Sequence, residues 1–372
     1  MNRFTLIIDL NWLCQSRFAV MTEGFKKDNP DAVKQKAQMD LRDLMARSIN
    51  VIINRFKSID NIIIVADGGS WRKEITPPRS ISNVVYKGNR EERRVKQDVD
   101  FKWVWETITQ IVGKSKELGI TVCKAGRIEG DDWIAHWSKY LNSRGVNCII
   151  WSSDCDLKQL VQCDPNTNAY TVWYNDKKGC VLPQSLYDDS DDIEFFMKPQ
   201  PDNQVLEDIK RRSTQVTYIS PDSIALEKFL CGDSGDNIRP AVSVSKNGKT
   251  YGISKKTCEK ILTDLNIDSI HTYIRSIDRL ADYIMGIGKF KDAHIDRDDL
   301  KNRLTYNVRM VWLNNRVIPQ DIQQIMAESE YKLFDIDYLR TNYRSILPED
   351  TSEIEMLFEG SQIGDDTENL PF

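Results

Sequence analysis

The chain has 372 residues and a formal net charge of −5, a length that suits one large domain or two ordinary ones. It has no apolar run of the roughly 18 residues that a membrane helix requires, and its N-terminus is charged too early for a signal peptide, so we expect a cytoplasmic protein without membrane contact. Its eight cysteines form no C-x-x-C pair, and it has three histidines. This composition argues against a zinc site and a disulfide framework, and leaves oxygen atoms as the ligands of any metal.

Charge is distributed unevenly along the chain. Residues 349–372 contain eight acids and no Lys or Arg, so the preceding part is mildly basic. Within that part, the segment 71–96 carries eight basic residues against three acids and includes Trp71 and Tyr86. Basic side chains interleaved with aromatic rings are typical of a nucleic-acid-binding surface. A solvated charged surface without a ligand is the alternative for such a run.

Short apolar runs rich in Ile and Val alternate with amphipathic stretches along the first half of the chain. The runs predict buried strands at 4–10, 61–69, 119–125 and 146–156, with a fifth strand at 169–175 nearer an edge. The amphipathic stretches predict helices at 38–57, 98–118 and 131–144. We therefore expect an α/β fold with a mostly parallel central sheet flanked by helices.

Acidic side chains lie at or just beyond the ends of the first four predicted strands. Because the carboxyl ends of parallel strands meet at one edge of a sheet, these side chains are expected to converge in one crevice. A single Asp at such a position commonly caps a helix, but acids at four strand ends favour a site for a hard divalent cation. The set comprises Asp9, Asp67, Glu129, Asp131, Asp132, Asp154 and Asp156.

The second half of the chain extends this acidic set and adds a basic element. In "CGDSGDNIRP", Asp233 and Asp236 are three residues apart, which places both carboxylates on one side of a helix or turn. In 244–265, a Gly turn precedes an amphipathic helix rich in lysine. Backbone N–H groups and lysines in such a turn would hold a phosphodiester backbone. Residues 266–345 predict further amphipathic helices.

These features divide the chain into four parts. We expect an α/β core at 1–183, an exposed acidic insertion at 184–215, a helical domain at 216–345 and an acidic, disordered tail at 346–372.

Six motifs, "LIIDLNWL", "VADGGSWR", "YKGNR", "IEGDDWIA", "SSDCDLKQL" and "CGDSGDNIRP", stand in the order and spacing of the 5′ nuclease superfamily of flap endonucleases and 5′→3′ exonucleases. Over about residues 4–320 the chain most resembles the T-even bacteriophage RNase H type, through "WRKEI", "YKGNR" and "RLTYNVRMVWLNNRVIP". The resemblance implies a PIN-like nuclease core, a helical arch over about 72–97 and a smaller C-terminal helical DNA-binding domain with a helix-hairpin-helix-like element.

The resemblance also implies roles for particular residues. The acids named above, with Asp233 and Asp236, would surround two Mg²⁺ ions, for which Mn²⁺ can substitute, and Asp132 would be catalytic. Lys87 and Arg90 would contact the scissile phosphate, and the alternative for both is phosphate positioning without a catalytic role. DNA contacts are implied for Arg72, Tyr86, Arg94, Lys246, Lys249, Lys255 and Lys256. The family often binds K⁺ at the element 244–265, where this chain departs from the family pattern with "GDSGDNIRPAVS" and "YGIS".

The tail carries two further resemblances. Its end, "GDDTENLPF", is similar to the C-terminal tip of bacterial single-stranded DNA-binding proteins, and "SEIEMLF" resembles a sliding-clamp peptide. We expect the tail to dock a replication partner of one of these kinds through Leu370 and Phe372, or to fold back on the basic arch and compete with DNA. A disordered solubilising tail is the alternative.

We therefore expect a monomeric, metal-dependent, structure-specific 5′ nuclease that removes RNA primers or 5′ flaps from DNA or RNA–DNA hybrids during replication. The balance of exonuclease and flap endonuclease activity, and the preference for RNA or DNA, stay open. One alternative is a catalytically silent DNA-binding relative, against which the full acidic set argues because it repels phosphate. A PIN-like endoribonuclease is the other, against which the arch motif and the element 244–265 argue.

Overall fold

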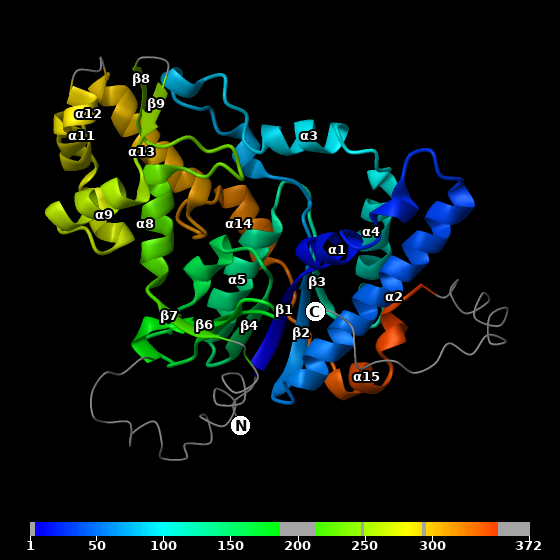
Figure 1. Cartoon of the computed structure of the whole chain (residues 1–372). Coiled ribbons are helices and arrows are strands. Elements are labelled where there is room, and N and C mark those ends of the chain that lie inside the picture. The colour runs from blue at the N-terminus through cyan, green and yellow to red at the C-terminus, as the bar shows by residue number, and fades with distance from the viewer. Residues whose placement is uncertain (1–3, 187–212, 214, 247–248, 292–294, 349–372) are drawn as a thin grey trace.

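The computed structural model describes residues 4–186, 213, 215–246, 249–291 and 295–348 of the chain. A central sheet lies between two layers of helices, and a second group of helices adjoins one edge of that sheet (Figure 1). Within the described residues, no helix combines the length and apolar character needed to cross a membrane. The expected α/β class with a mostly parallel central sheet is confirmed.

The central sheet has seven strands in the order β3-β2-β1-β4-β5-β6-β7. The five strands from β3 to β5 run parallel, whereas β6 is antiparallel to β5 and β7 is parallel to β6. Their bounds are β1 Phe4–Asp9, β2 Ile59–Val65, β3 Thr121–Cys123, β4 Asn147–Trp151, β5 Thr171–Asn175, β6 Gly179–Pro183 and β7 Val216–Ile219.

The five predicted strands are present, but their arrangement differs from the prediction in two respects. The strand at 169–175 is not at an edge, because β5 pairs with both β4 and β6. Sequence patterns missed β6 and β7, which complete the sheet beyond β5. The run "GCVLP" of β6 is buried at every position, so it lacks the alternation that marks a half-exposed strand.

Alternating side chains of the strands determine which helices cover each face. Leu6 and Ile8 of β1 face a layer formed by α1 Leu10–Phe18, α2 Asp31–Arg55, α4 Phe101–Glu117 and α15 Ile336–Thr341. Ile7, between them, faces a layer formed by α5 Gly130–Asn142, η4 Asp156–Leu160 and α14 Gln320–Ala327. All three side chains are fully buried, and each contributes about 1.5–3 kcal/mol through the hydrophobic effect.

The second group of helices has its own apolar core. It contains α8 Pro221–Cys231, the hairpin β8 Ser243–Lys246 and β9 Lys249–Gly252, α9 Lys255–Asp264, α10 Ile270–Arg275, α11 Ile277–Gly286, α12 Gly288–Lys291 and α13 Arg297–Val311. In the element predicted at 244–265, β8 pairs antiparallel with β9, and residues 247–248 between them lie outside the described residues. Ser254 caps α9 by accepting a hydrogen bond from the N–H of Thr257.

The predicted helical domain at 216–345 is divided between the two cores. Strand β7 belongs to the central sheet, and the side chains of Leu313, Ile322 and Met326 pack on the α5 side of that sheet. Ile346 and Leu347, placed in the tail by the sequence, are buried in the core beneath α2. Most of the predicted insertion, 187–212 and 214, and the tail residues 349–372 lie outside the described residues.

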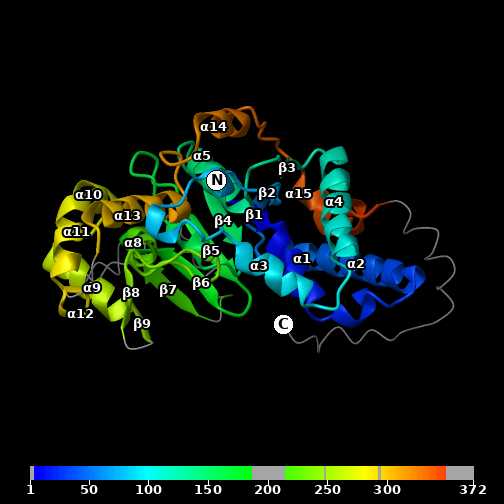
Figure 2. The same cartoon turned by 90° about the horizontal axis from the view of Figure 1, so that it is seen from above.

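The segment between β2 and α4 crosses above the carboxyl ends of the strands. It contains two short 3₁₀ helices, η2 Trp71–Glu74 and η3 Arg79–Ile81, and one helix, α3 Gly88–Val95. Seen from above, α3 lies beside α1 (Figure 2). The part of this segment before α3 packs on the second group of helices. Ile81 and Tyr86 belong to the apolar core of that group, and the N–H of Lys87 donates to the carbonyl of Asp236 at 2.9 Å.

Candidate active site

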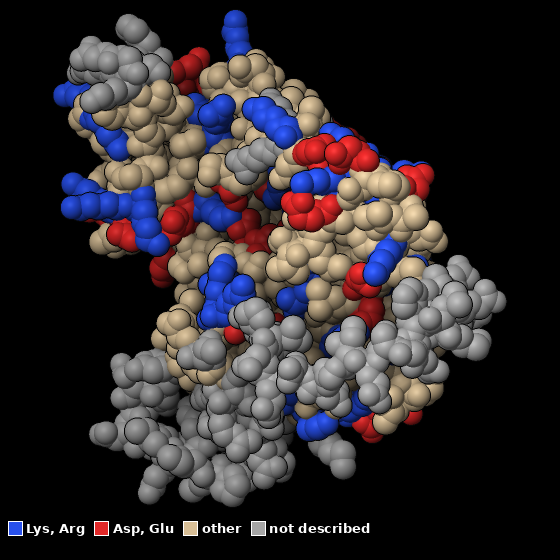
Figure 3. Space-filling model, turned by 45° about the vertical axis from the view of Figure 1, so that its right-hand side comes forward, with Lys and Arg blue, Asp and Glu red and all other residues tan. Residues whose placement is uncertain are grey.

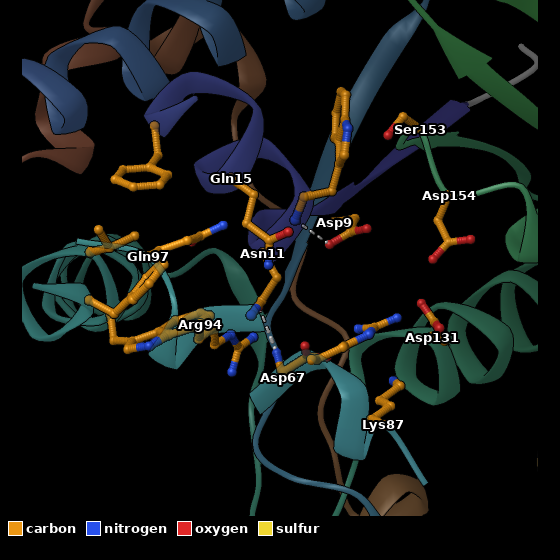
Figure 4. Close-up of a pocket in the computed structure, with 16 residues that line it drawn as sticks. Asp9, Asn11, Gln15, Asp67, Lys87, Arg94, Gln97, Asp131, Ser153 and Asp154 are labelled. Atoms are coloured by element: carbon orange, nitrogen blue, oxygen red, sulfur yellow. Dashed lines mark hydrogen bonds between the residues drawn. The ribbon is translucent and has the colours of Figure 1, made fainter. Parts of the chain in front are cut away.

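Four carboxylates face one pocket of about 470 Å³ at the carboxyl ends of the parallel strands (Figure 4). Asp9 is the last residue of β1, and Asp67 follows β2 by two residues. Asp131 lies in the first turn of α5, and Asp154 follows β4 by three residues. The space-filling view shows a hollow with acidic side chains at its floor and basic side chains beside it (Figure 3). The structure thus brings these four predicted residues together.

Hydrogen bonds orient the carboxylates of Asp9 and Asp67. Asp9 accepts from the N–H of Trp12 at 2.9 Å and from the hydroxyl of Ser152 at 2.8 Å. Asp67 accepts from the N–H of Gly130 at 2.7 Å, which joins the end of β2 to the start of α5. A Cβ atom at Gly130 would lie 3.1 Å from the same Asp67 oxygen, so glycine permits this close approach.

We define Asp9, Asp67, Asp131 and Asp154 as the open group, in which the negative charges of neighbouring members raise one another's pKa. Among the described residues, none of the four forms an ion pair within 4.0 Å. Burial, followed by the charges of Asp67 and Asp154, raises the pKa of Asp9 to about 7. Burial and the charge of Asp154 also raise the pKa of Asp131 well above its ordinary value. A bound cation stabilises the ionised form of carboxylates that are buried and repel one another.

Lysine and arginine side chains neutralise the other acids. Lys87 forms an ion pair with Glu129 and lies 3.8 Å from Asp236, which Arg90 also contacts. Burial opposes ionisation of Glu129, but the positive charges of Lys87 and Arg72 hold its pKa below the ordinary value.

A further lysine that sequence reasoning did not single out, Lys228, contacts both Asp156 and Asp233. Burial raises the pKa of Asp156 to about 6 in spite of this partner, because Asp154 adds negative charge nearby. Four of these eight acids line the pocket, and each of the other four is paired with a lysine or arginine.

Three predicted site residues form a buried network behind the pocket, and here the structure corrects the sequence predictions. The Arg72 guanidinium donates to both oxygens of Asp132 at 2.8 and 2.9 Å and to Glu129 at 2.8 Å. Asp132 is completely buried and also accepts from the Trp71 indole at 2.8 Å, so its oxygens are not available to a metal in the pocket.

Two residues predicted to contact DNA, Arg72 and Tyr86, are buried in the same network. Arg72 is 2% exposed, and its remaining donor reaches the carbonyl of Met310 at 3.1 Å. Tyr86 is 6% exposed, and its hydroxyl has two carboxylate acceptors for its single hydrogen, Glu129 at 3.2 Å and Asp236 at 3.1 Å. Neither side chain can reach DNA, because burial hides it and the acids use its polar atoms.

The donor chemistry of the pocket fits a hard divalent cation. The open group supplies oxygen ligands from four separate elements, and Mg²⁺ prefers such ligands while retaining several of its waters. Among the described residues, no three His, Cys, Asp or Glu side chains lie close enough together to hold an ion by direct contact alone. Carboxylates that would hold Mg²⁺ through its retained waters need not lie that close together.

The other half of the pocket is aromatic and basic. Trp12 and Phe18 of α1 line it with Phe101 and Trp105 of α4, and Gln15 and Gln97 supply amides. The Arg94 guanidinium lies over the Trp105 ring, 5.0 Å from its centroid. Sequence reasoning identified Arg94 but missed the rings. Their helical spacing, Trp105 four residues after Phe101, was the available signal.

A second pocket, whose charged lining residues are three lysines and Asp282, lies within the second group of helices. Lys256, Lys260 and Lys289 line a space of about 700 Å³ between α9, α11 and α12. Lys255 pairs with Glu227 at 3.0 Å on the adjoining surface. Lys246 and Lys249 occupy the two ends of the β8–β9 hairpin loop. The implied DNA contacts of these lysines stay predictions.

The chain is similar to known nucleases in sequence over its first half and in fold over most of its length. Residues 5–189 match the family model of the 5′-3′ exonuclease N-terminal resolvase-like domain. No curated protein sequence matches the chain at a significant level. Three solved bacteriophage T5 structures have the same fold. The D15 protein co-crystallized with metal ions is 16% identical, with a TM-score of 0.52 over 92% of this chain and 99% of that one.

The two other structures are similar to a comparable degree. The T5 D15 flap endonuclease complex with DNA and metal ions is 17% identical, with a TM-score of 0.53 over 92% of this chain and 99% of that one. The T5 5′-exonuclease with bound zinc is 18% identical, with a TM-score of 0.51 over 88% and 97%.

The chain therefore combines an α/β fold with an acid-lined pocket at the carboxyl ends of its parallel strands. Residues 5–189 belong to the 5′-3′ exonuclease N-terminal resolvase-like domain family, and this match together with the shared fold supports a 5′ nuclease superfamily.

Proposed function

We propose that this protein is a metal-dependent, structure-specific 5′ nuclease that hydrolyses phosphodiesters at 5′ ends or 5′ flaps. The observation that carries the proposal is the open group, four carboxylates from four elements without an ion-pair partner among the described residues. Such a group repels a phosphodiester unless cations intervene, and it is costly to a protein that only binds DNA. This argues against the catalytically silent alternative.

The residues around the pocket supply the parts that the reaction needs. Asp9, Asp67, Asp131 and Asp154 would hold Mg²⁺, or Mn²⁺ in its place, with Glu129, Asp156, Asp233 and Asp236 beside them. Two such ions, when bound, supply an activated water and stabilise the leaving oxygen. Lys87 and Arg90 line the same pocket, where their positive charges would orient the scissile phosphate and stabilise negative charge as it develops.

The aromatic half of the pocket supports a substrate with an unpaired strand. Rings of Trp12 and Trp105 with the Arg94 guanidinium form the combination that stacks bases and attracts the backbone of single strands. We infer a DNA or RNA–DNA substrate whose 5′ strand is free on one side of the cleaved bond. Removal of RNA primers or flaps in replication, as in the T-even RNase H type, is the role that this substrate suits.

The proposal has several further parts. Duplex DNA would contact the lysines of α9 and the β8–β9 hairpin, and K⁺ would bind in the element 244–265. The protein would act as a cytoplasmic monomer. A single-stranded DNA-binding protein or sliding clamp would bind Leu370 and Phe372. Deleting residues 349–372 tests this last part, since unchanged partner binding and unchanged DNA affinity would contradict it.

The proposed function is tested with a 5′-labelled flap substrate and a nicked RNA–DNA hybrid. We expect short 5′ products in Mg²⁺, no products in EDTA and loss of cleavage in Asp154→Ala. The product lengths show whether exonuclease or flap cleavage dominates, and the comparison of substrates shows the preference for RNA or DNA. Tight DNA binding without cleavage under all conditions would favour the silent DNA-binding relative instead.

A further inference from the structure

Lys228 connects two carboxylates that belong to different parts of the molecule. Its ammonium group contacts Asp156, at the start of η4 in the α/β core, and Asp233, in the loop after α8. The three side chains are between 16% and 23% exposed. Their charges are therefore only partly screened by solvent, and the contact is stronger than a pair on the open surface.

The surrounding structure holds this arrangement in place. Lys228 lies in the last turn of α8, between Leu226 and Phe229, whose side chains are buried in the second apolar core. Asp233 is oriented by the N–H of Gly235, which donates to its other oxygen at 2.8 Å. The backbone of Asp156 is fixed by its N–H, which donates to Asp154 at 2.8 Å. The ammonium thus has two acceptors in fixed positions.

We propose that Lys228 is an internal counter-ion of the metal site, which holds Asp156 and Asp233 in the metal-free protein and must be displaced before a second divalent cation can bind them. This inference rests on the proposed function. The first cation would bind at the open group, where no ion pair has to be broken among the described residues. The second would compete with an ammonium for the same oxygens, and this competition lowers its affinity. Lys228 is in this sense a positioning residue.

Replacing Lys228 by methionine should shift two measurable quantities in opposite directions. The metal-free protein loses a cation between two partly buried carboxylates, so its melting temperature falls. The second cation no longer has a competitor, so its affinity rises. A role limited to packing or fold maintenance would lower both quantities together, which makes the opposite signs diagnostic.

The experiment is a Mn²⁺ titration of the full-length protein without DNA, followed by electron paramagnetic resonance of free Mn²⁺, with thermal unfolding in EDTA. The matched control is Lys158→Met, which removes an equal charge two residues from Asp156. The Lys158 ammonium lies 4.6 Å from the Trp173 ring centroid. We expect Lys228→Met to raise the affinity for the second Mn²⁺ roughly tenfold, the same change in free energy as a shift of one pKa unit. Lys158→Met should change this affinity little.

A second variant keeps the test decisive if Lys228→Met folds poorly. Lys228→Arg retains the charge and offers two donors in a fixed fork to the same carboxylates, so the second Mn²⁺ should bind more weakly than in the wild type. Unchanged second-site affinity in both variants would overturn the role of Lys228 and leave the metal site intact. Absence of any Mn²⁺ binding by the wild type would overturn this inference together with the proposed metal chemistry.

Discussion

Replacing Arg72 by methionine should destabilise the protein far more than replacing an arginine with similar ion pairs on the surface. Arg72 is 2% exposed and donates to Asp132, Glu129 and the carbonyl of Met310. Its removal leaves a fully buried Asp132 without its cation, and the uncompensated charge costs about 3–5 kcal/mol of unfolding free energy. The network also joins η2, α5 and α13, so the loss affects both cores.

Arg127 supplies the matched control. It donates to Glu74 at two positions, both 2.7 Å, and to Asp321 at 2.7 Å, yet its side chain is 47% exposed. Solvent screens these pairs, so Arg127→Met should change stability much less despite similar geometry.

Urea denaturation of both variants at pH 7, followed by circular dichroism, measures the two free energies. Adding Asp132→Leu to Arg72→Met should recover part of the loss, because the unpaired buried charge is then removed. If Arg72→Met and Arg127→Met lose similar stability, or if Arg72→Met loses less than about 1 kcal/mol, the assignment of the network as a strong buried ion pair is refuted.

Three further predictions concern the pocket and its frame. Because burial raises the pKa of Asp9 to about 7, the folded metal-free protein binds this proton at pH values where the unfolded chain has released it, so stability falls as pH rises from about 4 to about 7. Thermal unfolding in EDTA should show this fall, and Asp9→Asn should make it less steep, because the raised pKa values of Asp131 and Asp156 leave part of it in place; an unchanged slope would contradict the assignment. In Gly68→Ala the new Cβ would lie 1.7 Å from the Ala125 carbonyl, so expression and melting temperature should drop, whereas Gly126→Ala, with open space, should behave as wild type. Trp105→Ala should weaken binding of a flapped substrate in EDTA several-fold without changing duplex binding, measured by fluorescence anisotropy, and equal losses on both substrates would exclude base stacking in the aromatic half of the pocket.

Five of the seven strands and the four carboxylates of the open group could be predicted from local pattern. Asp9 ends a short buried strand, Asp67 and Asp154 each follow one, and the carboxyl ends of parallel strands meet at one edge. The positions of these acids are therefore a consequence of chain order. Sequence patterns also identified the basic segment above the strand ends, where Lys87 and Arg90 line the pocket.

Local sequence patterns could not predict which of the acids would be paired with a lysine or arginine. Asp131 and Asp132 are neighbours in the first turn of α5, where successive side chains point about 100° apart. The first therefore lines the pocket, and the second pairs with Arg72 in the core. Lys228 pairs with Asp156 across 72 positions of the chain, and no local pattern reports such a contact.

By itself, the sequence determined the fold class, the parallel sheet and the convergence of acids at its edge, because these follow from hydrophobic periodicity and strand direction. The tertiary structure alone decided which carboxylates stay open to a cation and which are neutralised. It also showed that side chains from residues 313–347 pack in the α/β core. The physical reason is that burial and charge pairing depend on distances between segments remote in the chain. Those distances are set only when the helices and the sheet have packed.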